Sequence, residues 1–152
     1  MIRRQGEIRN MKKKVNYILY GITDSKWSEL TALEKQVEEA IEGGVTIVQY
    51  REKKLEGNAK KEQAIKIRDV CNKHDIPFLI NDDVYLAKEI DADGVHLGQS
   101  DMSPDKAREI LGEDKIIGVT AKTIEQAKTA YNMGADYLGS GAVFAVISFC
   151  RG

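Results

Sequence analysis

A group of polar side chains follows the second apolar run of the chain. Gln49, Arg51 and Lys53 come directly after residues 45–48, which have the composition of a buried strand. Side chains alternate with period two along a strand, so these three share one face. Two residues of the stretch point to the other face: Tyr50 and Glu52. An amide and two cations at a strand end suit an anionic ligand such as a diphosphate. Spacing alone leaves a solvated strand end as an equal alternative.

Carboxylates follow the next two apolar runs. Asp82 comes after residues 78–80 and Asp101 follows residues 94–97. Either carboxylate could bind Mg²⁺, which takes oxygen ligands and often a substrate phosphate. The alternatives are a helix cap, for which Asp83 is the better candidate, and a turn residue at Asp101. Each signal is weak alone, and their shared position after strands favours a metal site.

Three further polar residues have less specific signals. His96 lies within an apolar run, where a hydrogen-bonded core histidine is favoured over a catalytic one. Thr120 ends residues 116–119, so its hydroxyl could reach a phosphate or a substrate nitrogen. Lys122 is either a second cation or a solvated loop lysine.

Short apolar runs alternate with helical patterns along the chain. The apolar spacing and the glycine breaks predict six strands and five helices. The strands are expected at 15–22, 45–48, 78–80, 94–97, 116–119 and 137–140. The helices are expected at about 28–42, 59–74, 84–90, 104–111 and 123–133, with caps at Ser103 and Thr123.

This alternation indicates βα units and a parallel sheet. A weak repeat supports the reading, since Ala92-Asp93 before a strand recurs as Ala135-Asp136, 43 residues later. Polar residues gather after the strands, as in a (β/α)₈ barrel, where neighbouring strands would bring Asp82 and Asp101 together. A doubly wound sheet also binds ligands there, but no Gly-x-Gly-x-x-Gly opens the first helix.

Composition limits the class of protein. The 152 residues fit one domain, and a net charge of −1 gives no support to nucleic-acid or membrane binding. Positive charge gathers in residues 1–14, which we expect to be a disordered extension. No run approaches the roughly 18 apolar residues of a membrane span. The two cysteines have no metal-ligand spacing, so cytoplasm is the default location.

Four motifs in this order resemble thiamine-phosphate synthase, a (β/α)₈ TIM-barrel family, from about Tyr17 to Phe144. They are Gln-Tyr-Arg-Glu-Lys at 49–53, Ile-Asn-Asp-Asp at 80–83, Gly-Val-His-Leu-Gly-Gln at 94–99 with Asp101, and Gly-Val-Thr-Ala at 118–121. The resemblance implies a transferase that joins a pyrimidine-methyl diphosphate to a thiazole phosphate and releases pyrophosphate.

The resemblance also assigns roles. The implied pyrimidine-diphosphate ligands are Gln49, Tyr50, Arg51, Glu52, Lys53 and Asn81. Thr120 is a further implied substrate-binding residue, and the implied Mg²⁺ ligands are Asp82 and Asp101. Arg51 and Lys53 would neutralise the leaving diphosphate, and Thr120 completes the implied catalytic set. The family usually has serine at Thr120 and commonly histidine at Lys122. The thiazole nitrogen attacks a pyrimidine carbocation, so no enzyme nucleophile is required.

The end of the chain departs from the family. After Phe144 the family continues with a Thr-x-Thr-Lys-type loop and two more βα units, whereas here residues 145–152 follow as an atypical tail. We therefore expect a partial barrel at 15–144, with the ending of a truncated or frameshifted reading frame. Unpaired strand edges would favour self-association. A related thiazole tautomerase and an inactive fragment that only binds the pyrimidine diphosphate are the alternatives.

Overall fold

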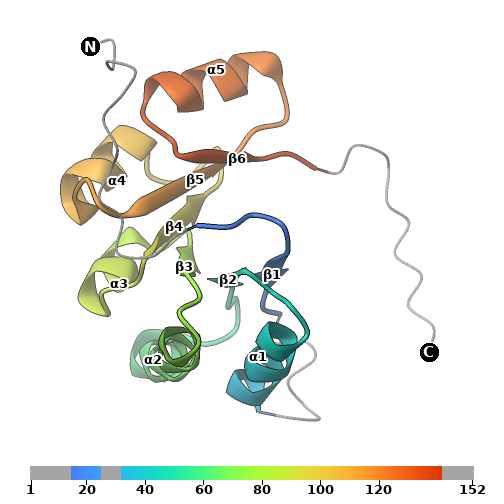
Figure 1. Cartoon of the computed structure of the whole chain (residues 1–152). Helices are drawn as coiled ribbons and strands as arrows, with labels where there is room; N and C mark the ends of the chain where they lie inside the picture. Colours follow the sequence, from blue (N-terminus) through green and yellow to red (C-terminus); the bar gives the residue numbers. More distant parts are fainter. Residues whose placement is uncertain (1–14, 25–31, 142–152) are drawn as a thin grey trace, which may run out of the picture.

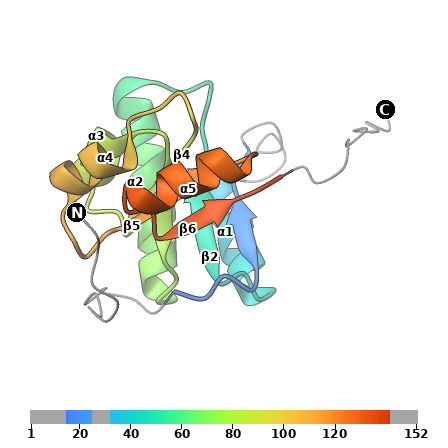
Figure 2. The same ribbon diagram turned by 90° about the horizontal axis from the view of Figure 1, so that it is seen from above.

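The computed structural model describes residues 15–24 and 32–141, and these form one curved parallel sheet with helices on one side (Figures 1 and 2). The strand order is β1-β2-β3-β4-β5-β6. The strands are β1 Tyr20–Ile22, β2 Ile47–Tyr50, β3 Phe78–Asn81, β4 Gly94–Leu97, β5 Ile116–Thr120 and β6 Tyr137–Gly139. The helices are α1 Leu33–Glu42, α2 Gly57–Lys73, α3 Val84–Glu89, α4 Pro104–Leu111 and α5 Ile124–Asn132. The predicted barrel-type α/β fold is confirmed for these six units.

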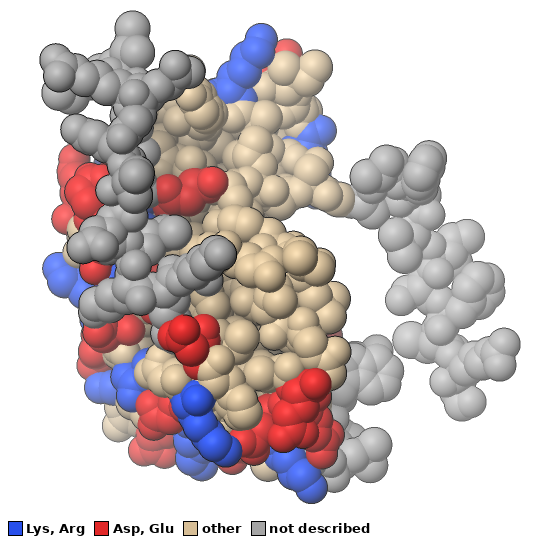
Figure 3. All heavy atoms as spheres, in the orientation of Figure 1, with Lys and Arg blue, Asp and Glu red and all other residues tan. Residues whose placement is uncertain are grey.

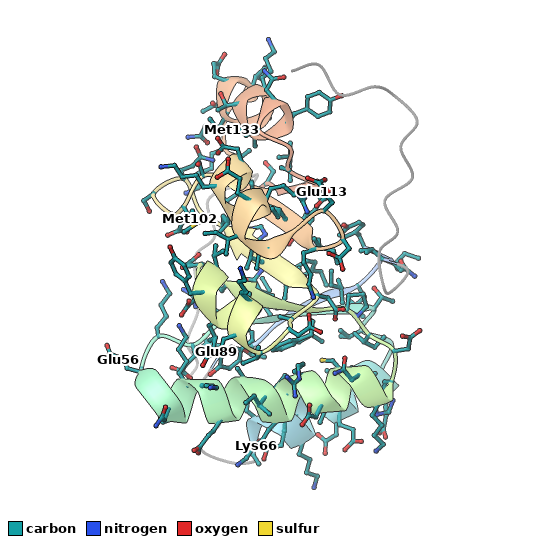
Figure 4. The ribbon with its side chains drawn as sticks, turned by 90° about the vertical axis from the view of Figure 1, so that its left-hand side faces the viewer. Glu56, Lys66, Glu89, Met102, Glu113 and Met133 are labelled. Atoms are coloured by element: carbon teal, nitrogen blue, oxygen red, sulfur yellow. The ribbon has the colours of Figure 1, made fainter. Side chains whose placement is uncertain are left out.

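Alternation along the strands separates two apolar clusters. The larger one lies between the sheet and the helices and includes Val48, Phe78, Ile80, Val95 and Ile117. A smaller cluster, which lies on the concave side, consists of Ile47, Leu79 and Ile116, with Val15, Tyr20 and Tyr137 packed against it. Polar positions of α2 face solvent, and Lys66 projects away from the sheet (Figure 4). The fold therefore leaves one side of the sheet open for a site.

The predicted order of elements is confirmed, but several boundaries were wrong. The first strand is shorter than the predicted 15–22: the Leu19 carbonyl still accepts a hydrogen bond from the Thr46 N–H, but the Leu19 N–H donates to the Thr46 side chain instead of to a backbone carbonyl. The second strand extends through Tyr50. Asp83 and Thr123 cap their helices as predicted, whereas Ser103 occupies the cap position without a capping bond. The predicted residues 28–31, the extension 1–14 and the tail 145–152 lie outside the described residues.

The weak sequence repeat has a structural cause. Asp93 opens β4 and accepts a hydrogen bond from the backbone N–H of Phe78 at 2.9 Å. Asp136 opens β6 and accepts one from Ile117 at 2.8 Å. Each aspartate therefore ties an even-numbered strand to the start of the strand before it.

A buried arginine lies at the amino-terminal end of the parallel strands, opposite the end where the site residues lie. Arg108 of α4 is 6 % exposed and donates to Asp136 Oδ2 at 2.7 Å. It also donates to the carbonyls of Gly112, at 3.0 Å, and Lys115. These bonds join α4, the loop before β5 and the loop before β6. No local sequence pattern predicts this role for Arg108.

Candidate active site

Gln49 is a buried polar residue on the concave side of β2. The residue is 3 % exposed, and its side-chain amide nitrogen donates to the Tyr20 hydroxyl at 2.8 Å. Ile47, two residues earlier, lies in the concave cluster, as the predicted alternation requires. Tyr50 lies on the helix side, where its hydroxyl donates to Gln63 at 2.9 Å. The Tyr50 side chain is therefore used in packing against α2 and is separated from the Gln49 face.

The loop after β2 holds the two cations. The backbone N–H of Arg51 donates to the Thr23 hydroxyl at 2.9 Å, which anchors the strand end to β1. Lys53 is exposed and lies close enough to Asp82 to oppose the rise in the pKa of that carboxyl. Glu52 accepts hydrogen bonds from the backbone of Lys54, at 2.5 Å, and Leu55, at 3.1 Å. The Glu52 carboxylate therefore shapes this loop.

Asp82 and Asp101 come together at the ends of β3 and β4. Partial burial, and then the hydrogen bond and negative charge of Asp101, raise the pKa of Asp82 to about 6. Asn81 and Lys53 act in the opposite direction. The Asp101 carboxylate is also fixed, because it accepts a bond from the Gly98 N–H at 2.6 Å. Two carboxyl groups held in contact favour a cation between them.

The backbone at Asp82 is left-handed. Its φ is 64°, a region that aspartate and asparagine tolerate better than most residues. The Asp82 N–H donates to the His96 carbonyl at 2.9 Å, and Asn81 pairs with His96 in the β3–β4 register. The chain thus turns sharply after Asn81, and this turn carries the Asp82 side chain to Asp101.

A cavity of about 430 Å³ lies beside Gln49 on the concave side. Its lining is mainly aromatic and apolar: Tyr17, Tyr20, Ile22, Gln49, His96, Tyr137, Leu138 and Gly139. Burial lowers the pKa of His96, so its imidazole is neutral at neutral pH. An aromatic wall with a few fixed polar groups suits a flat heteroaromatic ring.

Tyr20 and Tyr137 were missed as site residues in the sequence. Their hydroxyls lie 2.7 Å apart, although the residues are 117 positions apart. Side chains alternate along a strand, so Tyr137 lies on the same face as Gly139. This alternation was the available sequence signal for the position of Tyr137. His96 is the predicted hydrogen-bonded histidine, with Tyr137 and Thr120 as its partners. Lys122 lies exposed in the loop before α5.

Charged side chains are unevenly placed on the face seen in Figure 3. They gather mostly along its left and lower borders, while the centre consists largely of other residues. Acidic and basic groups are mixed at the borders. This distribution gives no support to a polyanion-binding surface on that face.

The sequence matches the model of a known protein family. The model of the family described as thiamine monophosphate synthase matches residues 19–148. The chain belongs to this family. The predicted resemblance is therefore confirmed over most of the chain.

Relatives within the thiamine monophosphate synthase family are similar in sequence and structure. The thiamine-phosphate synthase of Clostridium acetobutylicum is 51 % identical over 132 residues, which cover 87 % of this chain and 63 % of the relative. That of Ruminiclostridium cellulolyticum is 44 % identical, covering 89 % and 64 %. The solved thiamine phosphate pyrophosphorylase of Pyrococcus furiosus superimposes with a TM-score of 0.75 at 40 % identity, covering 83 % and 60 %. The chain spans less than two thirds of the length of these relatives.

Proposed function

We propose that the protein joins a pyrimidine-methyl diphosphate to a thiazole phosphate, forming thiamine phosphate and pyrophosphate. The observation that carries this proposal is the contact between Asp82 and Asp101, with Lys53 beside them. Membership of the thiamine monophosphate synthase family supports it. The aromatic cavity next to Gln49 has room for a pyrimidine ring.

The two carboxylates fit Mg²⁺. Within the described residues, no group of three or more histidine, cysteine or acidic side chains could hold a metal ion. A pair is nevertheless sufficient for Mg²⁺, which commonly takes one or two carboxylates and completes its shell with water and substrate phosphate. We propose Asp82 and Asp101 as its protein ligands. Bound Mg²⁺ would supply charge neutralisation to the diphosphate.

The chain's own residues would assist bond breaking by position and charge. Arg51 and Lys53 follow β2 at the same edge as the carboxylates, where they can neutralise the diphosphate as it leaves. The carbon–oxygen bond of the methylene breaks with its electron pair on the diphosphate. The thiazole nitrogen then forms the new carbon–nitrogen bond. Gln49 and Asn81 would orient the pyrimidine diphosphate, and no side chain acts as nucleophile.

Product formation tests the proposal directly. Purified protein would be mixed with both substrates and Mg²⁺, beside the Clostridium acetobutylicum relative as a positive control. Thiamine phosphate is the expected product. Calorimetric binding of the pyrimidine diphosphate without turnover would instead select a binding protein. Isomerisation of the thiazole alone would select a tautomerase, for which the carboxylate pair offers no role.

We expect metal-dependent binding to weaken as the pH falls through about 6. The pKa of Asp82 is raised from 3.8 to about 6, so the ionised form that can bind a metal predominates above that pH and is progressively lost below it. The same raised pKa means that ionising Asp82 destabilises the metal-free fold as the pH rises from 3.8 to 6. The Mg²⁺-induced rise in melting temperature should therefore grow between pH 5 and pH 8. Equal shifts at both pH values would contradict the assignment.

Self-association is a further proposal. Within the described residues β1 and β6 each pair with one strand, and Ile22 and Leu138 on them are 58 % and 43 % exposed. Unpaired edges with apolar side chains are prone to intermolecular pairing. Analytical ultracentrifugation over a concentration series should show mass increasing with concentration. A single monomeric species with cooperative thermal unfolding would argue against it.

The proposed location is the cytoplasm, where the small-molecule substrates would be found. Among the described helices, none is long and apolar enough to cross a membrane. We propose neither nucleic acid nor membrane as a partner.

A further inference from the structure

A chain of hydrogen bonds crosses the concave side of the sheet and ends at Thr120. Gln49 Nε2 is 2.8 Å from the Tyr20 hydroxyl, which lies 2.7 Å from the Tyr137 hydroxyl. Tyr137 is 2.8 Å from His96 Nδ1, and His96 Nε2 is 2.9 Å from Thr120 Oγ1. These contacts link β2, β1, β6, β4 and β5 in one continuous path.

The direction of donation follows from the first bond. The Gln49 NH₂ group can only donate, so the Tyr20 oxygen accepts. The Tyr20 hydrogen then has Tyr137 as its acceptor, and the Tyr137 hydrogen has His96 Nδ1. A neutral imidazole with an accepting Nδ1 carries its hydrogen on Nε2 and donates to Thr120.

The opposite direction is less favourable. It would make the Tyr20 oxygen accept from both Gln49 and Tyr137. Within the described residues, the hydroxyl hydrogen of Tyr20 would then have no recorded acceptor. A hydroxyl donor left without a partner at this part-buried position is destabilising. The first arrangement pairs every hydrogen along the path and leaves the Thr120 hydroxyl hydrogen available.

We propose that His96 is a positioning residue that, as the Nε2–H tautomer, turns Thr120 into a hydrogen-bond donor toward the ligand. The group opposite Thr120 is then an acceptor, either a phosphate oxygen or an unprotonated ring nitrogen. The identity of the ligand rests on the proposed function, whereas the tautomer does not. In this role His96 acts through Thr120.

Two glycines leave the space that this path requires. A Cβ atom at Gly118 would lie 2.0 Å from the Tyr137 ring, and one at Gly139 would lie 2.9 Å from His96 Cε1. Either added atom would displace a ring of the path. The Tyr17 ring packs on Tyr137 with centroids 5.0 Å apart and restricts it from the other side. The rings are therefore held closely enough to keep one arrangement.

Nitrogen NMR tests the tautomer without any ligand. The protein has two histidines, so a His74→Gln variant assigns both imidazole spectra. At neutral pH we expect Nδ1 of His96 to resonate as an unprotonated nitrogen and Nε2 as a protonated one. An Nδ1–H tautomer, or a protonated ring at pH 7, would overturn the proposal.

Tyr137→Phe removes one hydroxyl and keeps the ring. The His96 spectrum should lose its single-tautomer pattern and become an average of both forms. Tyr17→Phe is the matched control, because Tyr17 contacts the same ring but its hydroxyl is outside the path. An unchanged His96 spectrum in Tyr137→Phe would show that the path does not set the tautomer.

Binding of the pyrimidine diphosphate with Mg²⁺ tests the role of Thr120. Thr120→Val should weaken binding about 3–10-fold, the range for loss of one hydrogen bond, while Thr120→Ser should retain most of it. Adding Tyr137→Phe to Thr120→Val should cause no further loss, because Tyr137 acts through Thr120. Losses that multiply in the double variant would overturn the positioning role.

Inorganic pyrophosphate with Mg²⁺ identifies the acceptor. If Thr120→Val weakens pyrophosphate binding equally, the acceptor is a phosphate oxygen; an effect confined to the pyrimidine diphosphate assigns a ring nitrogen. Wild-type protein that binds neither compound but retains the Nε2–H tautomer would count against the proposed function and not against the hydrogen-bond path.

Discussion

Asp82→Asn is expected to abolish most of the proposed Mg²⁺-dependent activity while leaving the fold intact. Removing one charge-stabilising group at a reacting site typically costs about 10²–10³-fold in rate. Asparagine has nearly the shape of aspartate and tolerates the left-handed φ of 64° found here. The substitution also removes the negative charge that faces Asp101, so the melting temperature at pH 8 should be unchanged or higher.

Asp83→Asn is the matched control for this prediction. It makes the same chemical change one residue further on, where the carboxylate caps α3 and pairs with Lys60 at 2.9 Å. Asparagine also caps helices well, so Asp83→Asn should change stability little and leave metal dependence intact.

Two measurements should be made on both variants: kcat/KM with saturating Mg²⁺, and calorimetric affinity for the pyrimidine diphosphate with and without the metal. Affinity gives a readout that does not depend on turnover. Asp82→Asn should lose the difference between the two affinities. If Mg²⁺ still raised the affinity of Asp82→Asn fully, or if Asp83→Asn lost its Mg²⁺ dependence equally, the assignment of Asp82 as a ligand would be contradicted.

Arg108→Met is expected to destabilise the fold by about 3–5 kcal/mol, the cost typical of breaking a buried ion pair from one side. The variant removes the guanidinium that pairs with Asp136 and donates to the carbonyls of Gly112 and Lys115. Arg108→Lys keeps the charge but loses the planar fork that reaches several acceptors, so an intermediate loss is expected.

The control for Arg108 is an ion pair on the surface. Lys35 and Glu39 lie 3.9 Å apart with side chains 67 % and 62 % exposed, and Lys35→Met should cost less than about 1 kcal/mol. Urea unfolding followed by circular dichroism measures all three variants. A loss below about 1 kcal/mol for Arg108→Met would mean that the cluster contributes little to folding.

Much of the architecture could be predicted because its signals are local. Apolar runs, glycine breaks and the caps at Asp83 and Thr123 depend on neighbouring residues, and these elements were placed in the correct order. The first strand was predicted too long because its apolar composition continues to Val15, whereas at Leu19 only the carbonyl pairs with the neighbouring backbone and the N–H donates to the Thr46 side chain. Composition cannot show where a side chain replaces the backbone partner of a strand residue.

The candidate site could also be predicted in part. Period two correctly placed Gln49 on the face of Ile47, and the order of parallel strands anticipated the meeting of Asp82 and Asp101. The implied binding roles of the residues, including Tyr50 and Glu52, stay predictions. The structure shows that both of these side chains already have partners within the protein.

The sequence by itself determined the βα order, the faces of the strands and the family motifs, because each is written in spacing along the chain. Only the tertiary structure decided that Tyr20 meets Tyr137, that His96 is held between two hydroxyls and that Arg108 joins three segments. These contacts depend on the curvature of the sheet, which brings distant residues together. The periodicity within one segment contains no information about which distant segments meet in space.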